Sequence, residues 1–489
     1  MPLPRRNDPA STFRNLDWVT IAIYLIMVLA GMVSIYAANY NFDNASMFAF
    51  TEFSGKQLRW IGLSLLIALV IILIDTRMYE TYAYPIYILV AILLFITPFL
   101  ASDIKGSRSW LSFGSMSLQP AEFAKFATAL ALAKLFSSYH FVLNAKPSNY
   151  ARALTLIFIP IVLILLQNET GSALTFMALF FVLYREGMTG LVLFAAFFAV
   201  LIFVVAIKFT DPFVFGVPTG QFIVMIMIMA VMTGMAAVYS KRFEIGRNLV
   251  ILFAASGLVE YGLSLAGIAV PWLPVTLGII AVACIYIAIE AVKYHKPSLY
   301  VAVATAVLAT VFLFSVNMAF DKLQPHQKLR IQVALGIVED LRDAGYNVNQ
   351  SKIAIGSGGF FGKGFLNGTQ TKLKYVPEQH TDFIFCTIGE EEGFVGAMLV
   401  TLLFLALILR ILAIGERQPT TFGRVYAYCV AWYFIFHFCI NIGMVIGLCP
   451  VIGIPLPFFS YGGSSLWGFT ILLFILLKID ATRKNVLAY

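Results

Sequence analysis

Fourteen apolar runs, most of them near the length of a membrane-spanning helix, constrain this chain more than any other feature. A helix needs about 20 mainly apolar residues to cross the hydrocarbon core of a bilayer. Only 12% of the 489 residues are charged, whereas soluble globular proteins carry about 25%. The sequence therefore predicts an all-α, polytopic helical membrane protein with about 14 transmembrane helices, at residues 18–37, 58–74, 81–100, 121–136, 153–166, 172–183, 190–207, 221–239, 248–266, 272–292, 300–320, 393–414, 425–448 and 465–479.

The loops between these runs carry their positive charge in a regular pattern. If the N-terminus is cytoplasmic, every loop predicted on the inner side is basic, as the positive-inside rule requires. The C-terminus is then cytoplasmic too, and the long polar stretch 321–381 lies outside. This arrangement explains the net charge of +8, so we expect no nucleic acid as a partner.

Three predicted outer segments are also basic, against the same rule. They contain Lys105 with Arg108, Lys208, and the stretch 321–381. An anionic ligand on the outer side would explain this charge. An ordinary solvated loop, whose cations are offset by acids such as Asp321 and Glu339, explains it as well.

Ionisable residues mark two places at the outer ends of predicted spans. Pro120 suits the first turn of a helix, so Glu122 and Lys125 lie three residues apart on one helix face. Glu169 lies in a polar break between two short apolar runs, and irregular polar backbone at membrane depth persists only inside protein or beside water. Such residues are costly and usually functional, but a structural ion pair at Glu122 and a simple tight turn at Glu169 remain open.

The region 350–396 holds the strongest candidates. Its run of glycines around Lys363 permits close backbone approach to a ligand and suits a phosphate, although the spacing is not that of a P-loop. Asp382 follows at the mouth of an apolar segment, beside Glu378 and His380. A carboxylate there can act as a general base or hold a divalent cation, and it can equally cap a helix.

The last candidate region is the run GIPLPFFSYGGSS at 453–465. Its prolines and glycines cannot continue a helix, so we expect a rigid outer loop. Its apolar half suits a lipid tail, and its polar half, with Ser460, suits a head group. The four regions together describe an outward-facing site for an anionic amphiphile, and they leave both an enzyme and a transporter open.

These four regions together resemble the SEDS family of polytopic proteins of bacterial wall synthesis. The phrases PEQHTDFIF and GIPLPFFSYGGSSL carry the resemblance most specifically. The runs AIGSGGFFGKGFLNGTQ and NIGMVIG are closer to the elongation branch of the family than to its division branch. Matching stretches follow in the family order at 106–125, 167–174, 327–331, 346–396 and 441–466.

The resemblance implies a peptidoglycan glycosyltransferase that polymerises lipid II into glycan strands during cell elongation and releases undecaprenyl pyrophosphate. The family's catalytic aspartate falls on Asp382, and Glu169 stands where the family usually has an aspartate. A requirement for a divalent cation, Mg²⁺ or Mn²⁺ at Asp382, is left open. We expect substrate-binding roles for Arg108, Trp110, Glu122, Lys125, Glu169, Gln327, Arg330, Lys363, Glu378, His380 and Ser460.

The resemblance also implies a setting. We expect the bacterial cytoplasmic membrane, contact with membrane lipid, and partners that include a class B penicillin-binding protein and other elongation-machinery proteins. Two other functions remain open at this point, a lipid II flippase or transporter and a non-catalytic scaffold for a transpeptidase.

The family usually has ten spans, so about four of the predicted helices are additional. We expect N-terminal core helices in 1–208 and inserted helices in 209–298. The last helix before the catalytic loop should lie in 299–320, the large extracytoplasmic loop in 321–381 and the C-terminal helices in 382–489.

Overall fold

The fold is helical throughout, apart from two short hairpins. The structure, a computed structural model, describes residues 13–483 except 41–51, 104–105, 114–115, 212, 215, 269–270, 324 and 339–344. In the hairpins, β1 (Leu111–Phe113) pairs antiparallel with β2 (Met116–Leu118), and β3 (Phe213–Val214) pairs antiparallel with β4 (Val217–Pro218). The predicted all-α class is confirmed.

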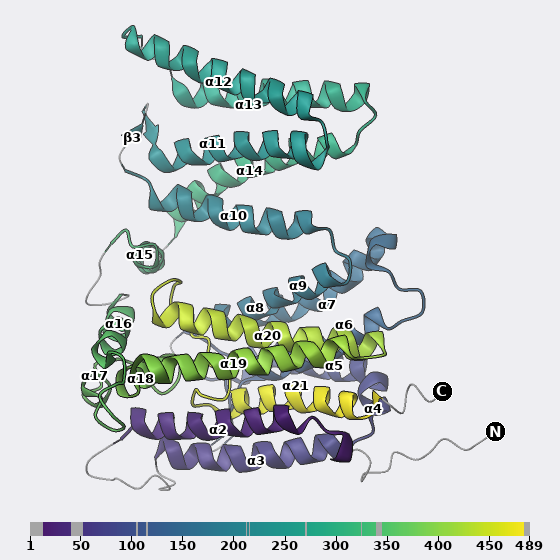
Figure 1. Cartoon of the computed structure of the whole chain (residues 1–489), viewed down its shortest axis with the longest axis vertical. Coiled ribbons are helices and arrows are strands. Elements are labelled where there is room, and N and C mark those ends of the chain that lie inside the picture. Colours follow the sequence, from purple (N-terminus) through teal and green to yellow (C-terminus); the bar gives the residue numbers. More distant parts are fainter. Residues whose placement is uncertain are drawn as a thin grey trace, which may run out of the picture. The chain divides into compact units, whose positions relative to one another are not determined.

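The chain forms two compact units, one of Met1–Thr189 with Leu341–Tyr489 and one of Gly190–Asp340. In the first unit α2, α3, α19, α20 and α21 run alongside one another, with α16–α18 at one end and α4 at the other (Figure 1). We call these the α18 end and the α4 end. Its helices are α2 (Trp18–Ala38), α3 (Phe53–Leu73), α4 (Thr76–Thr81), α5 (Ala83–Leu100), α6 (Pro120–Phe136), η1 (Leu143–Ala145), α7 (Pro147–Leu165), α8 (Thr170–Thr175), η2 (Phe176–Ala178), α9 (Leu179–Arg185), α16 (Tyr346–Gly358), α17 (Thr369–Lys372), α18 (Ile384–Glu391), α19 (Gly393–Glu416), α20 (Thr421–Val445) and α21 (Gly463–Ala481).

The second unit has its own apolar core. Buried Met225, Ile228 and Met232 of α11 pack in one cluster with Ile280 of α13 and Leu313 of α14. The unit starts before the predicted insertion at 209–298 and ends after it, so it includes the flanking helices α10 and α14. Its elements, besides β3 and β4, are α10 (Gly190–Lys208), α11 (Thr219–Gly234), the π-helical η3 (Met235–Tyr239), α12 (Phe243–Leu265), α13 (Trp272–Lys293), α14 (Ser298–Lys322) and α15 (Pro325–Ala334).

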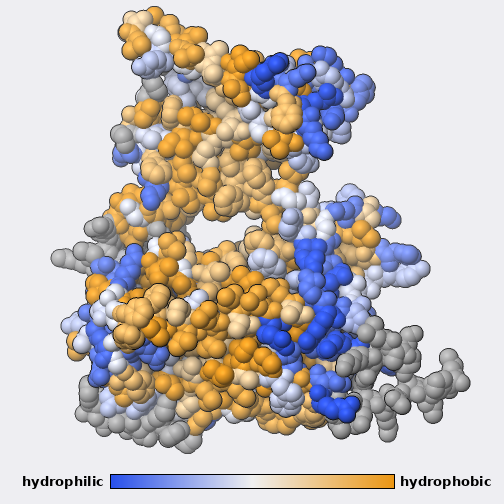
Figure 2. Space-filling view, viewed as in Figure 1, coloured by the Kyte–Doolittle hydropathy of each residue, from blue (hydrophilic) through white to orange (hydrophobic). Residues whose placement is uncertain are grey.

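Each of the fourteen predicted spans coincides with a helical segment. Among the described residues, twelve helices are long and apolar enough to cross a membrane. The other two are α6, with 17 residues, and the segment Thr170–Arg185, which a 3₁₀ turn interrupts at Phe176–Ala178. On the first unit, Figure 2 shows an apolar surface over the helices with hydrophilic residues gathered toward their ends. The chain is a multi-pass membrane protein.

Local signals explain where key helices begin. Pro120 occupies the first turn of α6, as predicted, because its missing N–H is not needed there. Asp17 caps α2 by accepting a hydrogen bond from Thr20 N at 3.0 Å. Farther along α2, Gly31 lies against the carbonyl of Phe458, and a methyl group at this glycine would overlap that oxygen. The missing side chain therefore lets α2 pack directly on the 453–460 loop.

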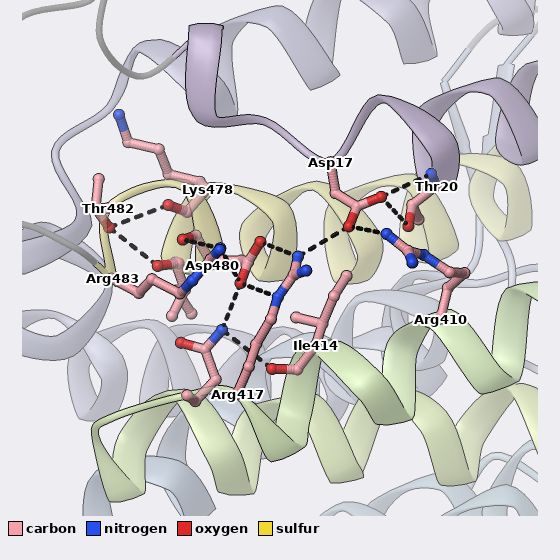
Figure 3. Close-up of polar contacts among 11 residues, drawn as sticks. Asp17, Thr20, Arg410, Ile414, Arg417, Lys478, Asp480, Thr482 and Arg483 are labelled. Atoms are coloured by element: carbon pink, nitrogen blue, oxygen red, sulfur yellow. Dashed lines mark hydrogen bonds and ion pairs between the residues drawn. The ribbon is translucent and has the colours of Figure 1, made fainter.

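A buried ionic network joins three helices at the α4 end of the first unit (Figure 3). Arg417, at the end of α19, bonds Asp17 at 2.8 Å and also bonds Asp480 of α21. Arg410 bonds Asp17, and Arg483 bonds Asp480 at 2.7 Å. Burial alone raises the pKa of Asp17, but hydrogen bonds from Thr20 and Arg417 outweigh it, so the pKa lies below its usual value. Asp17 therefore stays charged, and the ion pairs of the two carboxylates hold α2, α19 and α21 together.

Candidate functional site

The two phrases that carry the family resemblance most specifically are bonded to each other at the α18 end. Tyr461 N donates to the carbonyl of His380 at 2.8 Å. The hydroxyl of Ser460 donates to the carbonyl of Thr381 at 2.6 Å and accepts from Leu456 N at 2.8 Å. Ser460 therefore fixes the backbone next to Asp382, and its predicted contact with substrate stays a prediction.

Asp382 belongs to the first of these phrases and is half-buried. Asn441 of α20 donates from its amide nitrogen to the Asp382 carbonyl at 2.9 Å and to the Ile454 carbonyl at 2.8 Å. A methyl group placed on Gly453 would lie 3.4 Å from Oδ2 of Asp382. The helix that follows, α18, has Phe383 rather than Asp382 at its N-cap position.

Glu378 and His380 share a tight turn with Asp382. Glu378 adopts a positive φ of 51°, and its carbonyl accepts from the backbone of Thr381 and Phe383. The ring of His380 lies between Phe53, at 4.5 Å, and Tyr461, at 5.8 Å. The turn therefore presents Glu378 to solvent while aromatic contacts hold His380.

A carboxylate orders the loop that carries Arg108. Oε2 of Glu169 accepts from the hydroxyls of Ser107, at 2.8 Å, and Ser109, at 3.1 Å. Arg108 N donates to the Gln167 carbonyl at 3.0 Å. The Arg108 side chain is 59% exposed, 3.9 Å from Asp103, and the neighbouring Trp110 is half-buried. Glu169 thus organises the backbone, and Arg108 offers an accessible cation.

Close packing links this loop to the Asp382 segment. Gly171, at the start of α8, lies against the carbonyl of Ile452, and a methyl group there would overlap that oxygen. Gln119 donates to the Ser172 hydroxyl at 3.2 Å. Ile452 adjoins Gly453, where an added methyl group would lie 3.4 Å from Asp382 Oδ2. The predicted regions around Arg108, Glu169, Asp382 and Ser460 therefore converge within the first unit.

Glu122 and Lys125 form a buried ion pair, as their spacing predicts. Lys125 Nζ lies 2.8 Å from Glu122 Oε1, and the side chains are 1% and 2% exposed. The same ammonium lies 2.9 Å from Nε2 of His437 on α20 and 4.8 Å from the Phe469 ring centre. Both charges lie inside protein, so direct contact with substrate stays a prediction.

Lys363 lies close to a buried carboxylate. Its ammonium is 2.7 Å from Oε1 of Glu390, a fully buried residue of α18. Glu390 also accepts from the backbone N–H groups of Thr369, Gln370 and Thr371 at 2.8–2.9 Å. Burial alone raises the pKa of Glu390, but the hydrogen bonds from Lys363 and these amides lower it to about 2. Lys363 and α17 are therefore fixed to α18, and the expected contact between Lys363 and pyrophosphate stays a prediction.

The structure leaves the predicted roles of Gln327 and Arg330, and the predicted divalent cation, untested. Gln327 and Arg330 lie on α15 in the second unit, and their side chains lie outside the described part of the structure. Among the described residues, no group of three or more His, Cys, Asp or Glu side chains is arranged to hold a metal ion. Mg²⁺ usually keeps several waters and takes few protein carboxylates, so Asp382 as a single ligand is compatible with a cation but does not specify one.

The sequence analysis did not single out Asn441, His437 or Glu390. Asn441 and His437 lie four residues apart inside an apolar run, where intramembrane polar residues are themselves a signal. Glu390 belongs to a run of three glutamates, 390–392, next to an apolar span. Each acts through a partner distant in the chain, such as Lys125, 312 positions from His437, and sequence spacing alone does not reveal such a partner.

The chain is similar to named proteins along most of its length. The family model described as cell cycle protein, FTSW_RODA_SPOVE, matches residues 17–221 and 226–485. Peptidoglycan glycosyltransferase RodA of Treponema pallidum (strain Nichols) is 27% identical over 96% of this chain and 98% of its own length. Peptidoglycan glycosyltransferase MrdB of Escherichia coli (strain K12) is 30% identical over 88% of this chain and 86% of its own length.

Solved structures share the fold. A chain from the structure entitled "Structural coordination of polymerization and crosslinking by a peptidoglycan synthase complex" matches with a TM-score of 0.60 and 22% identity, over 96% of this chain and 98% of that one. The crystal structure of Thermus thermophilus rod shape determining protein RodA matches with a TM-score of 0.54 and 21% identity, over 96% and 97%. The chain therefore belongs to the FtsW/RodA/SpoVE family of cell cycle proteins.

Proposed function

We propose that this chain is a peptidoglycan glycosyltransferase that polymerises lipid II into glycan strands during cell elongation. Two of its relatives, from Treponema pallidum and Escherichia coli, are named peptidoglycan glycosyltransferases and align with most of this chain. The observation that carries the proposal is the half-buried Asp382, located where the two most specific family phrases are bonded to each other.

Asp382 is the general base in this proposal. The acceptor sugar hydroxyl attacks the anomeric carbon of the donor, a new glycosidic C–O bond forms, and the C–O bond to the lipid diphosphate breaks. The hydroxyl proton passes to Asp382, and undecaprenyl pyrophosphate leaves with the bonding electron pair. A positioned general base typically contributes about 10²–10⁴-fold to such a rate.

Arg108 is the cation best placed to meet the leaving diphosphate. It is exposed, and Glu169 orders its loop through Ser107 and Ser109. A guanidinium binds phosphate through several N–H donors, so it stabilises charge that develops on the leaving group. Trp110 would pack beside the same group. Glu378, His380 and Ser460 would contact the sugars near Asp382, and we assign no step to a divalent cation.

Lys363 is expected to bind the same diphosphate, and the substrate-binding roles of Gln327 and Arg330 stay predictions. The Lys363 ammonium donates to Glu390 and to the Thr369 hydroxyl, which orders its loop. Its third N–H is left for a phosphate oxygen. Glu122 and Lys125 would support the substrate site from within the bundle.

The setting follows from the charge pattern and the relatives. We place both termini in the cytoplasm and the Asp382 site at the outer face of the bacterial cytoplasmic membrane. The reason is that the loops predicted on the opposite, inner side are all basic. One solved relative belongs to a peptidoglycan synthase complex that couples polymerisation with crosslinking. We propose a class B penicillin-binding protein as the partner of this chain, with other elongation-machinery proteins and membrane lipid around it.

Incubation of the purified protein with lipid II tests the proposal. We expect glycan strands, resolved by gel electrophoresis, and release of one undecaprenyl pyrophosphate for each bond formed. A transporter would instead move lipid II across a vesicle membrane without joining it. Transport with no strand synthesis, in the presence of the partner as well, would contradict the proposal.

A further inference from the structure

Two polar side chains one helical turn apart on α20 bind two consecutive carbonyls of the 453–460 loop. Nδ1 of His437 lies 3.1 Å from the Pro455 carbonyl oxygen, and Asn441 Nδ2 lies 2.8 Å from that of Ile454. His437 is 1% exposed and Asn441 is fully buried. We call this pair the α20 clamp.

The partners of His437 define its protonation. A backbone carbonyl only accepts hydrogen bonds, so Nδ1 carries the proton. A lysine ammonium only donates, so Nε2, 2.9 Å from Lys125 Nζ, supplies a lone pair. We therefore assign His437 as a neutral imidazole in the Nδ1–H tautomer, which links the Glu122–Lys125 ion pair to the Pro455 carbonyl.

The same clamp reaches Asp382. The amide nitrogen of Asn441 donates to the Asp382 carbonyl as well as to that of Ile454. Gly453, next to Ile454, lies near the Asp382 carboxylate, because a methyl group on it would be 3.4 Å from Oδ2. A continuous series of bonds therefore runs from Glu122 on α6, through Lys125 and His437, to the backbone beside the base.

We propose that His437 is a positioning residue of the transfer reaction. Its two hydrogen bonds fix the Pro455 carbonyl and, together with Asn441, set the distance between the 453–455 backbone and the Asp382 carboxylate. This inference rests on the proposed role of Asp382. Misplacement of a reacting group by about 1 Å can cost about 10²-fold in rate, so loss of the clamp should act on kcat rather than on KM.

Two substitutions separate hydrogen bonding from packing. The amide of His437→Gln can donate to Pro455 and accept from Lys125, whereas His437→Leu removes both bonds and keeps comparable bulk. In purified enzyme we expect His437→Leu to lower kcat for lipid II polymerisation about 10–100-fold with KM changed less than about threefold. We expect His437→Gln to retain kcat within about threefold. Cys439→Ala, at an exposed position of the same helix, is the matched control and should match wild type.

The outcomes are distinguishable. Wild-type kcat in folded His437→Leu, or equal losses in the Leu and Gln variants, would overturn the positioning role. Activity in Asp382→Asn would instead overturn the proposed function on which it rests. If His437→Leu does not fold, nitrogen-15 NMR of histidine-labelled wild-type protein still tests the proposal, because it shows which ring nitrogen of His437 is protonated. The signals that disappear in His437→Gln identify those of His437. A protonated Nδ1 and an unprotonated Nε2 support the proposal, and the other tautomer or an imidazolium overturns it.

Discussion

At the scale of single residues, buried carboxylates in this protein hold backbone in place. Glu390 accepts hydrogen bonds from three backbone amides of α17 and forms an ion pair with the ammonium of Lys363. Gln379 then links the Thr371 carbonyl of α17 to the turn that contains Asp382. The glutamate therefore supports the catalytic turn although it lies eight positions beyond Asp382.

Acidification should loosen this loop. The pKa of Glu390 is lowered from its usual 4.5 to about 2, so its stabilisation is complete above about pH 4.5 and is lost as pH falls toward 2. The shift corresponds to about 3 kcal/mol. Protection of the amides of residues 363–372 against exchange, relative to their intrinsic rates, should fall over that pH range. Glu390→Gln should lower this protection at neutral pH, while protection in α20 stays constant. Unchanged exchange in the Gln variant would refute the role of Glu390.

Sequence reasoning at this scale succeeded where the partner was close in the chain. The Glu122–Lys125 pair follows from i,i+3 spacing, and the structure confirms it. The hydroxyl of Ser460 and the ammonium of Lys363 were assigned to a ligand, and the structure shows both with protein partners that the pattern did not reveal. Their expected ligand contacts remain predictions.

At the scale of elements, contacts stabilise the helices of the first unit at both of its ends. At the α4 end, Asp17, Arg417 and Asp480 join α2, α19 and α21. At the α18 end, Gly31 of α2 packs on the 453–460 loop, and α21 begins just after that loop. The ionic network therefore resists sliding of one helix past another at the end away from Asp382.

Removal of one carboxylate should show how much the network contributes. Asp480→Asn keeps the shape of the side chain but removes one of the two carboxylate partners of Arg417 and the carboxylate partner of Arg483. Hydrogen bonds to charged groups contribute about 1.5–3 kcal/mol each. We expect a lower thermal midpoint in detergent. Glu80→Gln, at the half-exposed pair with Lys134, should change it little. Equal midpoints for the two variants would contradict the structural role of the network.

The sequence predicted the long helices because a bilayer fixes their length. It did not predict α15, α16 and α17, which form helices within the stretch treated as a loop from 321 to 381. Polar helices of this kind lack the periodic apolar residues by which a helix is predicted from sequence. In addition, α17 is stabilised by hydrogen bonds to Glu390, a residue outside it. Pro120 is the counterexample, where one residue located a helix start correctly.

At the scale of the whole molecule, the chain combines a first unit that contains Asp382 with a second unit of further membrane helices. The family model matches residues 17–221 and 226–485, and so covers most of both units. The predicted boundaries of the insertion, 209–298, therefore stay a prediction.

The orientation in the membrane can be tested directly. A cysteine reporter inserted at Asn367, in the loop before α17, should be extracytoplasmic. Cysteine reporters at Lys241 and at the C-terminus should be cytoplasmic, because the loops predicted on the inner side are basic. Accessibility to a membrane-impermeant thiol reagent in intact cells measures each position. Labelling of the Asn367 and C-terminal positions from the same side would contradict the proposed topology.

The central claim, that Asp382 is the general base, is tested most directly by the rate at which purified Asp382→Asn polymerises lipid II. The substitution keeps the side-chain volume and removes the charge, and the backbone bonds from Asn441 to residue 382 remain available. We predict a loss of about 10²–10⁴-fold in turnover with an unchanged thermal midpoint. Polymerisation near the wild-type rate by the folded variant would contradict the account.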